Sequence, residues 1–422
     1  MAEIIPFKGI LYNPQKVAAS NVMSPPYDIV TPQLKNALYA RDTHNIVRID
    51  FGKDHDGDNE RENRYTRALQ FMKEWLREGI FIKDAEPLFY CYEAAYKIHN
   101  QEKRLRGFLG AVRIEELGTG HIHPHEMKYS KPKSDRLNIL RYCNANTSPI
   151  FSLYSSKERR TSSIIEDIVL KEPFLQAKDG DGFTHRIWRI DNPDSMETIQ
   201  RELSDKEIFI ADGHHRYETA SAFKKEMEAK TVNPSGKESF NYVLMFLSNM
   251  EDNGLTLLPT HRLVEIDSDI NVKETLRKYF NVQKISQEGK SEEQIRQLMF
   301  AEMHNKVHTF GMFLTNSDTY YSLSSDGKTV AMDLPQCLQN LDVSVLHRFI
   351  FEKLLHIGHF EYEMDPVRAV ERAKKDSFEA VFFLNSTEIQ EVRDVALGGE
   401  RMPPKSTYFF PKLLTGMVMY TF

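Results

Sequence analysis

Residues 208–220 read IFIADGHHRYETA, and this stretch carries the strongest structural and chemical signal in the chain. The apolar run before Asp212 predicts a buried strand, and the residues after Gly213 predict a helix that continues to about Lys230. Glycine permits a tight turn and a close approach of a ligand to the main chain. Because the first turn of a helix has unpaired N–H groups and the positive end of the dipole, this junction suits phosphate.

Polar side chains are dense at this junction. His214 and His215 add two titratable rings, and Arg216 adds a permanent positive charge. Asp212 can cap the helix, hold a metal ion or position a hydroxyl group. Because adjacent helical residues point about 100° apart, one metal ion cannot easily take both rings, so we expect one histidine on the ligand and the other packed behind it. A surface helix capped by Asp212 with incidental histidines is the competing interpretation.

The rest of the chain alternates between strand and helix patterns. The predicted strands are residues 88–98, 106–114, 185–190 and 207–211 and a pair within 308–323, and the predicted helices are residues 63–78, 195–203, 214–230 and 343–355. This order predicts an α+β fold with mixed sheets and flanking helices. A chain of 422 residues suggests two or three domains. We place an N-terminal α+β domain at 1–160, a core with the DGHHR turn at 161–265 and a C-terminal α+β domain that closes over the site at 266–422.

Composition argues against several classes of protein. The net charge is 55 − 61 = −6, which makes a nonspecific nucleic-acid binder a poor candidate. No apolar stretch approaches the roughly 20 residues that a membrane-spanning helix needs, and the N-terminus lacks a secretory signal pattern. The three cysteines are odd in number and far apart, so no disulfide framework is expected. We therefore expect a cytoplasmic protein.

A second polar cluster occupies residues 121–126. His121, His123 and His125 alternate along the chain, so an extended backbone would put them on one face, where they could hold a divalent metal. Alternatively, His125 and Glu126 act together as a base or as an anchor for a hydroxyl group, or the segment is a polar loop with surface histidines. Pro124 favours a loop or an edge strand.

Two further segments have the composition of anion-binding sites. The first contains five basic residues: Lys128, Lys131, Lys133, Arg136 and Arg141. The second is MPPKSTY at 402–408, where two prolines precede Lys405, Ser406 and Thr407. A solvated charged face and a rigid structural loop are the respective alternatives. No G-x-x-x-x-G-K-[ST] sequence occurs in the chain, which excludes a Walker-type NTPase.

The sequence resembles, nearly from end to end, the bacterial and archaeal family called domain of unknown function 1015. The strings that carry this resemblance are PPYDIV at 25–30, HE at 125–126, DRL at 135–137, ANTSPIFSLY at 145–154, IADGHHRYETA at 210–220, LPTHRLV at 258–264, LDVSVLH at 341–347 and MPPKSTYFFPKL at 402–413. Together they are specific for membership, and the family name implies no activity.

A more distant resemblance concerns the DGHHR string. It is similar to a string in proteins of the ParB/sulfiredoxin fold, including free-serine kinases that use ADP or ATP, and it covers about residues 183–230. The resemblance implies a ParB/sulfiredoxin-like core in which the residues from Asp212 to Arg216 lie at the nucleotide phosphates. It also implies a separate acidic residue that activates the substrate hydroxyl. Glu126 is our preferred candidate for this base, and Asp28 is its rival.

These observations lead to the hypothesis of a nucleotide-dependent phosphotransferase that acts on a small hydroxyl-bearing metabolite, resembling the free-serine or hydroxy amino acid kinases. It would use Mg²⁺ with ATP or ADP and no organic redox cofactor. The expected catalytic residues are Asp212, His214, His215, Arg216 and Glu126. The expected phosphate-binding residues are Gly213, Lys405, Ser406, Thr407 and Arg136. The expected substrate-binding residues are Tyr27, Asp28 and His125.

Two other functions stay open at this point. One is a ParB-like regulator that binds DNA or a protein partner under the control of a nucleotide, although the net charge of −6 speaks against DNA. The other is a metal-dependent hydrolase built on His121, His123 and His125. Under the preferred hypothesis the partners are a nucleotide and a small molecule, without nucleic acid or membrane, and a homodimer is compatible with the sequence.

Overall fold

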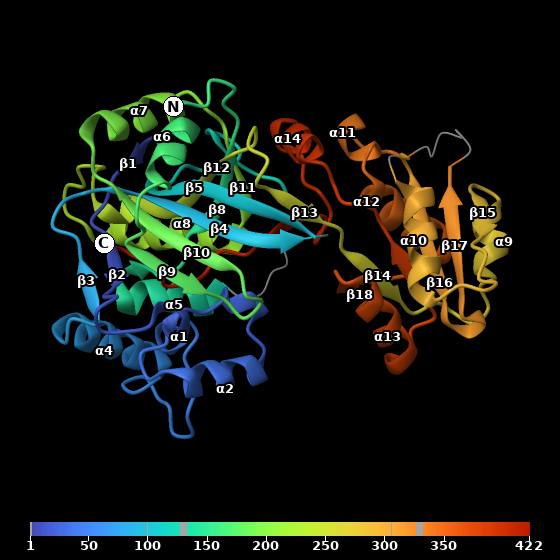
Figure 1. Ribbon diagram of the computed structural model, residues 1–422, viewed down its shortest axis with the longest axis horizontal. Helices are drawn as coiled ribbons and strands as arrows, with labels where there is room; N and C mark the ends of the chain where they lie inside the picture. The colour runs from blue at the N-terminus through green and yellow to red at the C-terminus, as the bar shows by residue number, and fades with distance from the viewer. Residues whose placement is uncertain (1, 99, 127–132, 305, 326–331) are drawn as a thin grey trace. The chain divides into compact units, whose positions relative to one another are not determined.

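The computed structural model describes the whole chain except residues 1, 99, 127–132, 305 and 326–331 (Figure 1). The chain divides into two compact units. The first unit comprises Met1–Pro124, Lys128–Thr256 and Pro411–Phe422, and the second comprises His125–Met127 and Leu257–Phe410. The three-part division of the sequence analysis stays a prediction.

A nine-stranded mixed sheet forms the centre of the first unit. Its strands follow the order β6-β11-β8-β12-β5-β4-β10-β9, and β1 also pairs with β5. Their bounds are β6 (Ile122–Pro124), β11 (Ile208–Asp212), β8 (Ile150–Tyr154), β12 (Tyr242–Asn249), β5 (Gln101–Arg113), β4 (Phe89–Ile98), β10 (Thr184–Ile190), β9 (Leu175–Lys178) and β1 (Ile4–Ile5). Strand β11 runs parallel to β6 and antiparallel to β8, and β8 runs parallel to β12.

The helices of the first unit bury apolar faces against this sheet and against one another. Helices α6 (Arg160–Ile168), α7 (Pro193–Leu203) and α8 (His214–Lys230) contribute to one hydrophobic core with the strands. Helix α5 (Lys133–Cys143) packs on α8 and on α4 (Arg64–Arg77), which packs on α3 (Val47–Asp50). Helix α4 begins at a capping box of Asn63 and Thr66, which satisfies N–H groups that the first turn leaves open.

The second unit has its own antiparallel sheet of six strands. The order is β15 (Asn281–Lys284), β17 (Thr319–Ser324), β16 (Thr309–Leu314), β19 (Ala380–Phe383), β14 (His261–Val264) and β18 (Phe360–Glu363). Helices α9 (Val272–Arg277), α10 (Glu292–Met303), α13 (Pro366–Asp376) and α14 (Ile389–Leu397) belong to this unit. A short helix α12 (Asp342–Ser344) runs directly into the π-helix η4 (Val345–Leu355).

Most of the remaining elements are short. They are β2 (Ile10–Tyr12), α1 (Ala19–Val22), η1 (Tyr27–Ile29), α2 (Pro32–Arg41), β3 (Phe81–Lys83), β7 (Ala145–Asn146), η2 (Ser239–Asn241), β13 (Thr256–Leu258), η3 (Thr315–Ser317), α11 (Gln336–Gln339), β20 (Tyr408–Phe410) and β21 (Tyr420–Thr421).

The predicted α+β class with mixed sheets and flanking helices is confirmed. A search of the described residues finds no helix that is both long and apolar enough to span a membrane.

Strands β5 and β12 pack closely against each other at Gly107. A side chain at Gly107 would clash with the Leu247 carbonyl oxygen and would approach the Phe246 ring to 2.6 Å. Strand β12 is buried along its whole length, so the neighbouring backbone has little room to move away. The absence of a side chain at position 107 is therefore required by this strand contact.

We expect Gly107→Ala to destabilise the first unit by about 2 kcal/mol, because overpacking displaces a buried strand. Thermal unfolding of the full chain measures the effect as a lower Tm. Gly180→Ala is the matched control, since a side chain there meets nothing within 4 Å. Equal melting temperatures for the two variants would contradict this account of the contact.

Candidate functional site

The predicted strand–turn–helix junction is present in the first unit. Strand β11 ends at Asp212, and α8 begins at His214. Gly213 occupies the N-cap position with φ 96° and ψ 27°, in the left-handed region that favours glycine. The N-cap residue is a glycine and has no side chain with which to cap the helix, and a cap by Asp212 stays a prediction.

Arg216 folds back beneath this turn. A Cβ at position 213 would lie 2.8 Å from the Arg216 Nε atom, so only glycine leaves room for the guanidinium. The Arg216 guanidinium donates to Ser148 Oγ at 3.2 Å and to the Pro149 carbonyl oxygen at 2.5 Å. Its other terminal nitrogen lies 3.3 Å from Asp212 Oδ2. The turn and the arginine therefore form one rigid arrangement.

Asp212 lies between two cations. Its Oδ2 atom is 3.3 Å from Arg216 and 3.4 Å from the Lys412 Nζ atom. All three side chains are at most one quarter exposed, so solvent screens these pairs only partly. The three groups together carry a charge of +1, which favours an anion at this end of α8. Sequence reasoning did not identify Lys412, which lies 200 residues away in the chain.

The two imidazoles of the DGHHR turn are half-buried. The Nδ1 atom of His215 lies 3.8 Å from Glu218 Oε2. Neither ring is fully buried or fully exposed, and the two residues directly precede Arg216 in the chain. The Nε2 atom of His214 and the Nδ1 atom of His215 are themselves buried.

A small cavity of about 30 Å³ opens beside Arg216. Its polar lining comes from Arg136 on α5, Arg216 and Thr219 on α8, and the segment Asn146, Thr147 and Ser148. Two guanidinium groups from different helices therefore share one cavity with hydroxyl and amide groups. These donors suit an oxyanion, but the volume of the cavity is only that of about one water molecule, and the rest of its lining is apolar.

Arg136 lines this cavity, and two carboxylates fix its side chain. It is buried, and it donates to Asp50 Oδ1 at 3.0 Å and to Asp135 Oδ2 at 2.7 Å. The Tyr27 ring covers its guanidinium at 4.1 Å, and burial raises the pKa of the Tyr27 hydroxyl. The two carboxylates balance much of the Arg136 charge, so Arg216 is the better placed of the two to attract an anion.

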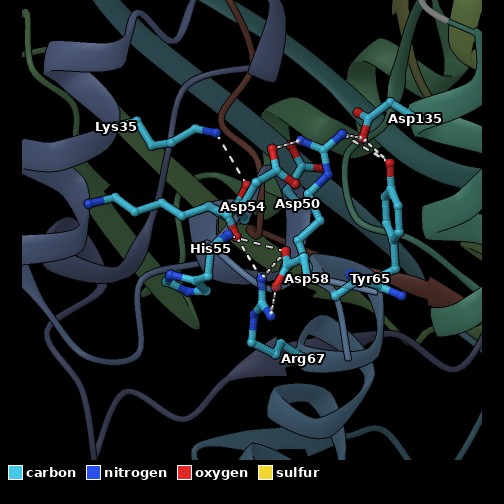
Figure 2. A network of polar contacts seen from close by, with 12 residues as sticks. Lys35, Asp50, Asp54, His55, Asp58, Tyr65, Arg67 and Asp135 are labelled. Atoms are coloured by element: carbon cyan, nitrogen blue, oxygen red, sulfur yellow. Dashed lines mark hydrogen bonds and ion pairs between the residues drawn. The ribbon is translucent and has the colours of Figure 1, made fainter. Parts of the chain in front are cut away.

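Asp135 belongs to a wider polar network that also contains Asp50 and Tyr65 (Figure 2). Its Oδ1 atom accepts from Arg64 at 2.5 Å and from the Tyr65 hydroxyl at 3.0 Å. Burial alone would raise the pKa of Asp135, but the arginines outweigh it and hold the pKa below its usual range. The structure thus brings together the predicted residues Tyr27, Arg136 and Arg216, and the exposed Asp28 follows Tyr27 in η1.

The other predicted residues lie in the second unit. The His125 Nε2 atom is 2.9 Å from Thr407 Oγ1, and Glu126 Oε1 accepts from the Ser406 main-chain N–H at 3.1 Å. Lys405 is exposed and has φ 57°, and Ser406 is buried. These five residues form one local group around the 402–407 loop.

The remaining histidines of the second cluster have a different partner. His121 Nδ1 lies 3.0 Å from Glu207 Oε1, and His123 Nε2 lies 2.5 Å from the other oxygen of Glu207. Burial acts to raise the pKa of Glu207, but its bonds to the two imidazoles lower it overall. Among the described residues, no group of three His, Cys, Asp or Glu side chains is suitable for a metal ion.

The basic segment does not form one patch in the part of the chain that the structure describes. Lys128 and Lys131 lie outside the described residues, and Lys133 is the first residue of α5. Arg136 is buried, whereas Arg141 lies near the surface and donates to Glu226 at 2.5 and 3.0 Å. Of the described arginines here, only Arg136 lines the cavity beside Arg216.

The chain belongs to the family described as a protein of unknown function, DUF1015, whose family model matches residues 4–344. This confirms the family resemblance seen in the sequence. The comparison with curated proteins gives no match.

Similarity to solved structures is weak. A free serine kinase in complex with AMP is 13% identical, with 70% of this chain and 89% of that chain covered and a TM-score of 0.33. A conserved hypothetical protein from Pyrococcus furiosus is 13% identical, with 70% and 92% covered and a TM-score of 0.32. SbnI from Staphylococcus aureus, with a C-terminal truncation, is 11% identical, with 73% and 85% covered and a TM-score of 0.35. TM-scores of this size do not define a shared fold.

Gly213→Ala should destabilise the protein by more than the left-handed backbone alone would cost, because the methyl group also displaces Arg216. Gly182→Ala is the matched control, since Gly182 has φ 80° but has nothing within 4 Å of its Cβ position. We expect a loss of about 1 kcal/mol for the control and about 2 kcal/mol or more for Gly213→Ala. Chemical denaturation measures both, and equal losses would disprove the steric link to Arg216.

Asp135→Asn should lower stability by about 2 kcal/mol at pH 7, because it removes the charge that faces two arginines. A carboxyl group whose pKa is lowered by folding adds stability above its unfolded pKa of about 3.9 and loses it as the pH falls further. The difference between the wild-type protein and the variant should therefore shrink below about pH 4. Urea unfolding across pH measures this difference, with the exposed Asp56→Asn as control. A gap that persists unchanged at low pH would contradict this electrostatic account.

Proposed function

We propose that this protein is a nucleotide-dependent phosphotransferase that acts on a small hydroxyl-bearing metabolite, of the type represented by hydroxy amino acid kinases. The observation that supports this proposal is the position of Arg216, at the start of α8 and in a cavity shared with Arg136. The resemblance of the DGHHR string to that of ParB/sulfiredoxin-fold proteins adds the nucleotide, ATP or ADP, and a ParB-like core. The expected location is the cytoplasm.

Phosphoryl transfer suits these residues because it depends mainly on positioning and on stabilisation of charge. The main-chain N–H groups at the start of α8 and the Arg216 guanidinium would hold a phosphate group. Since Asp212 and the main-chain oxygen of Pro149 already restrain Arg216, little conformational entropy would be lost on binding. A half-buried histidine, His215, would stabilise the negative charge that develops during transfer.

Magnesium would enter with the nucleotide. Mg²⁺ in such enzymes is held by one or two carboxylates and by the substrate phosphates. Asp212 is already paired with Arg216 and Lys412, which makes it a poor ligand for a protein-bound ion. Asp212 would instead orient Arg216 and the acceptor group.

Binding of nucleotide can be tested by thermal unfolding with ATP, ADP or AMP in the presence of Mg²⁺. A ligand that binds only the folded state raises the Tm. We expect nucleotide to raise the Tm of the wild-type protein and of the near-surface variant Arg141→Gln, and to leave the Tm of Arg216→Gln unchanged.

Asp212→Asn and His215→Ala should each abolish turnover without unfolding the protein. No rise with any nucleotide, or full activity in both of these variants, would remove the proposal.

The general base can be assigned by a pair of isosteric variants. Glu126→Gln keeps an oxygen that can accept from the Ser406 N–H but loses the charge that accepts a hydroxyl proton. We expect this variant to bind nucleotide normally and to lose transfer by a factor of about 10² or more. The same loss in Asp28→Asn instead would assign the base to Asp28. Normal turnover in both variants would exclude both carboxylates.

A further inference from the structure

One face of the large sheet changes from apolar to basic along its strands. Phe108 on β5, Cys91 on β4 and Trp188 on β10 lie side by side on this face, and they are buried in the core that also contains residues of α6 and α7. Side chains on a strand alternate between the two faces, so residues two positions apart lie on the same face. Two and four positions beyond this apolar row, the same face therefore carries a different set of residues.

Those residues come from four neighbouring strands, β5, β4, β10 and β9 (Figure 1). They form two rows, which we together call the basic face. The first row consists of Arg106, Glu93, Arg186 and Gln176, and the second consists of Arg104, Ala95, Thr184 and Lys178. Of these eight residues only Glu93 is buried, so this part of the face is accessible from solvent.

Glu93 holds three arginines in fixed positions. Its Oε1 atom accepts from Arg186 at 2.7 Å and from Arg104 at 3.2 Å. Its Oε2 atom accepts from Arg106 at 2.8 Å. The Glu93 side chain is 2% exposed, whereas the three arginine side chains are between 25% and 50% exposed. A guanidinium has five N–H donors, so the bonds to Glu93 orient the three groups and use only part of their donors.

The basic face has a surplus of positive charge. The three arginines and Lys178 contribute four positive charges, and Glu93 contributes one negative charge, which leaves +3. The chain as a whole carries −6, so this concentration of positive charge is local and opposite in sign to the net charge of the molecule. Like charges on neighbouring positions of a sheet repel one another, and a bound anion relieves that repulsion.

The spacing and the kinds of residue on the basic face indicate which anion fits. Residues two positions apart on a strand, such as Arg104 and Arg106, are about 6.7 Å apart. Carboxylates at alternate positions of an extended peptide have the same repeat, and arginine binds carboxylates through paired N–H groups. Proteins that bind single-stranded nucleic acid provide aromatic rings on which the bases stack, and none of the eight residues is aromatic. The face is therefore better suited to an acidic peptide than to a nucleic acid.

We propose that the basic face binds an acidic segment of a partner protein, whose glutamate or aspartate side chains pair with Arg104, Arg106 and Arg186. None of these arginines lines the cavity beside Arg216, so the inference does not depend on the proposed function. Because the attraction is between charges on an exposed surface, it weakens as the salt concentration rises.

Fluorescence anisotropy of the full chain with a labelled peptide of four glutamate–serine repeats tests the proposal. We expect binding at about 50 mM NaCl and a loss of affinity by a factor of about ten at about 200 mM, because salt screens the exposed charges. The matched peptide of glutamine–serine repeats has no charged side chains and should not bind. No binding of the acidic peptide at low salt, or equal or tighter binding of an octamer of uridine, would overturn the proposal.

A variant locates the peptide. Arg104→Gln removes the most exposed of the three guanidinium groups and leaves Glu93 with its two other arginines, so circular dichroism should show an unchanged fold. We expect at least fivefold weaker binding of the acidic peptide. Arg201→Gln on α7 is the matched control, because it removes the same charge from an exposed side chain outside the basic face. Wild-type affinity in Arg104→Gln, or the same loss in both variants, would place the peptide elsewhere and overturn the assignment.

Sedimentation velocity distinguishes a partner protein from a second copy of this chain. A wild-type monomer whose binding of the acidic peptide is weakened by Arg104→Gln supports the proposal. Self-association that disappears in Arg104→Gln would identify the basic face as a contact between two copies and would overturn the assignment to a different protein.

Discussion

The contact between Gly213 and Arg216 is the constraint on which the candidate phosphate site depends. A guanidinium lies where any side chain at position 213 would have to be, and the left-handed backbone of the glycine makes this possible. An arginine, a helix N-terminus and a small cavity are thereby held together before any ligand arrives, which is the condition for electrostatic preorganisation.

Buried arginines in the two units serve different purposes according to their partners. Arg136 is paired with two carboxylates, so its main effect is to fix the floor of the cavity and to join α5 to α3. Arg216 donates to Ser148 and to the Pro149 carbonyl oxygen and is also paired with Asp212. Arg262 donates to His347 and to the Lys405 carbonyl oxygen.

Most of the regular elements could be predicted because their signals are local. The helix predicted at 63–78 is α4, the helix predicted at 214–230 is α8 with the same bounds, and the strand pair around 316–317 is β16 and β17. The apolar helix predicted at 343–355 is present, but most of it is a π-helix. Hydrophobic periodicity indicates a helix and a buried face, and it does not distinguish the hydrogen-bond pattern of a π-helix from that of an α-helix.

The sequence by itself determined the strand, the glycine and the helix of the DGHHR turn, the polar residues gathered there and membership of the family. These are short-range properties, since turn chemistry and periodicity act over a few residues. Only the tertiary structure decided that Lys412 pairs with Asp212, that Ser148 and Arg136 join Arg216, and that Glu207 takes His121 and His123. Each of these contacts joins residues tens to hundreds of positions apart, and their meeting depends on the order and direction of strands in the sheet, which no local pattern encodes.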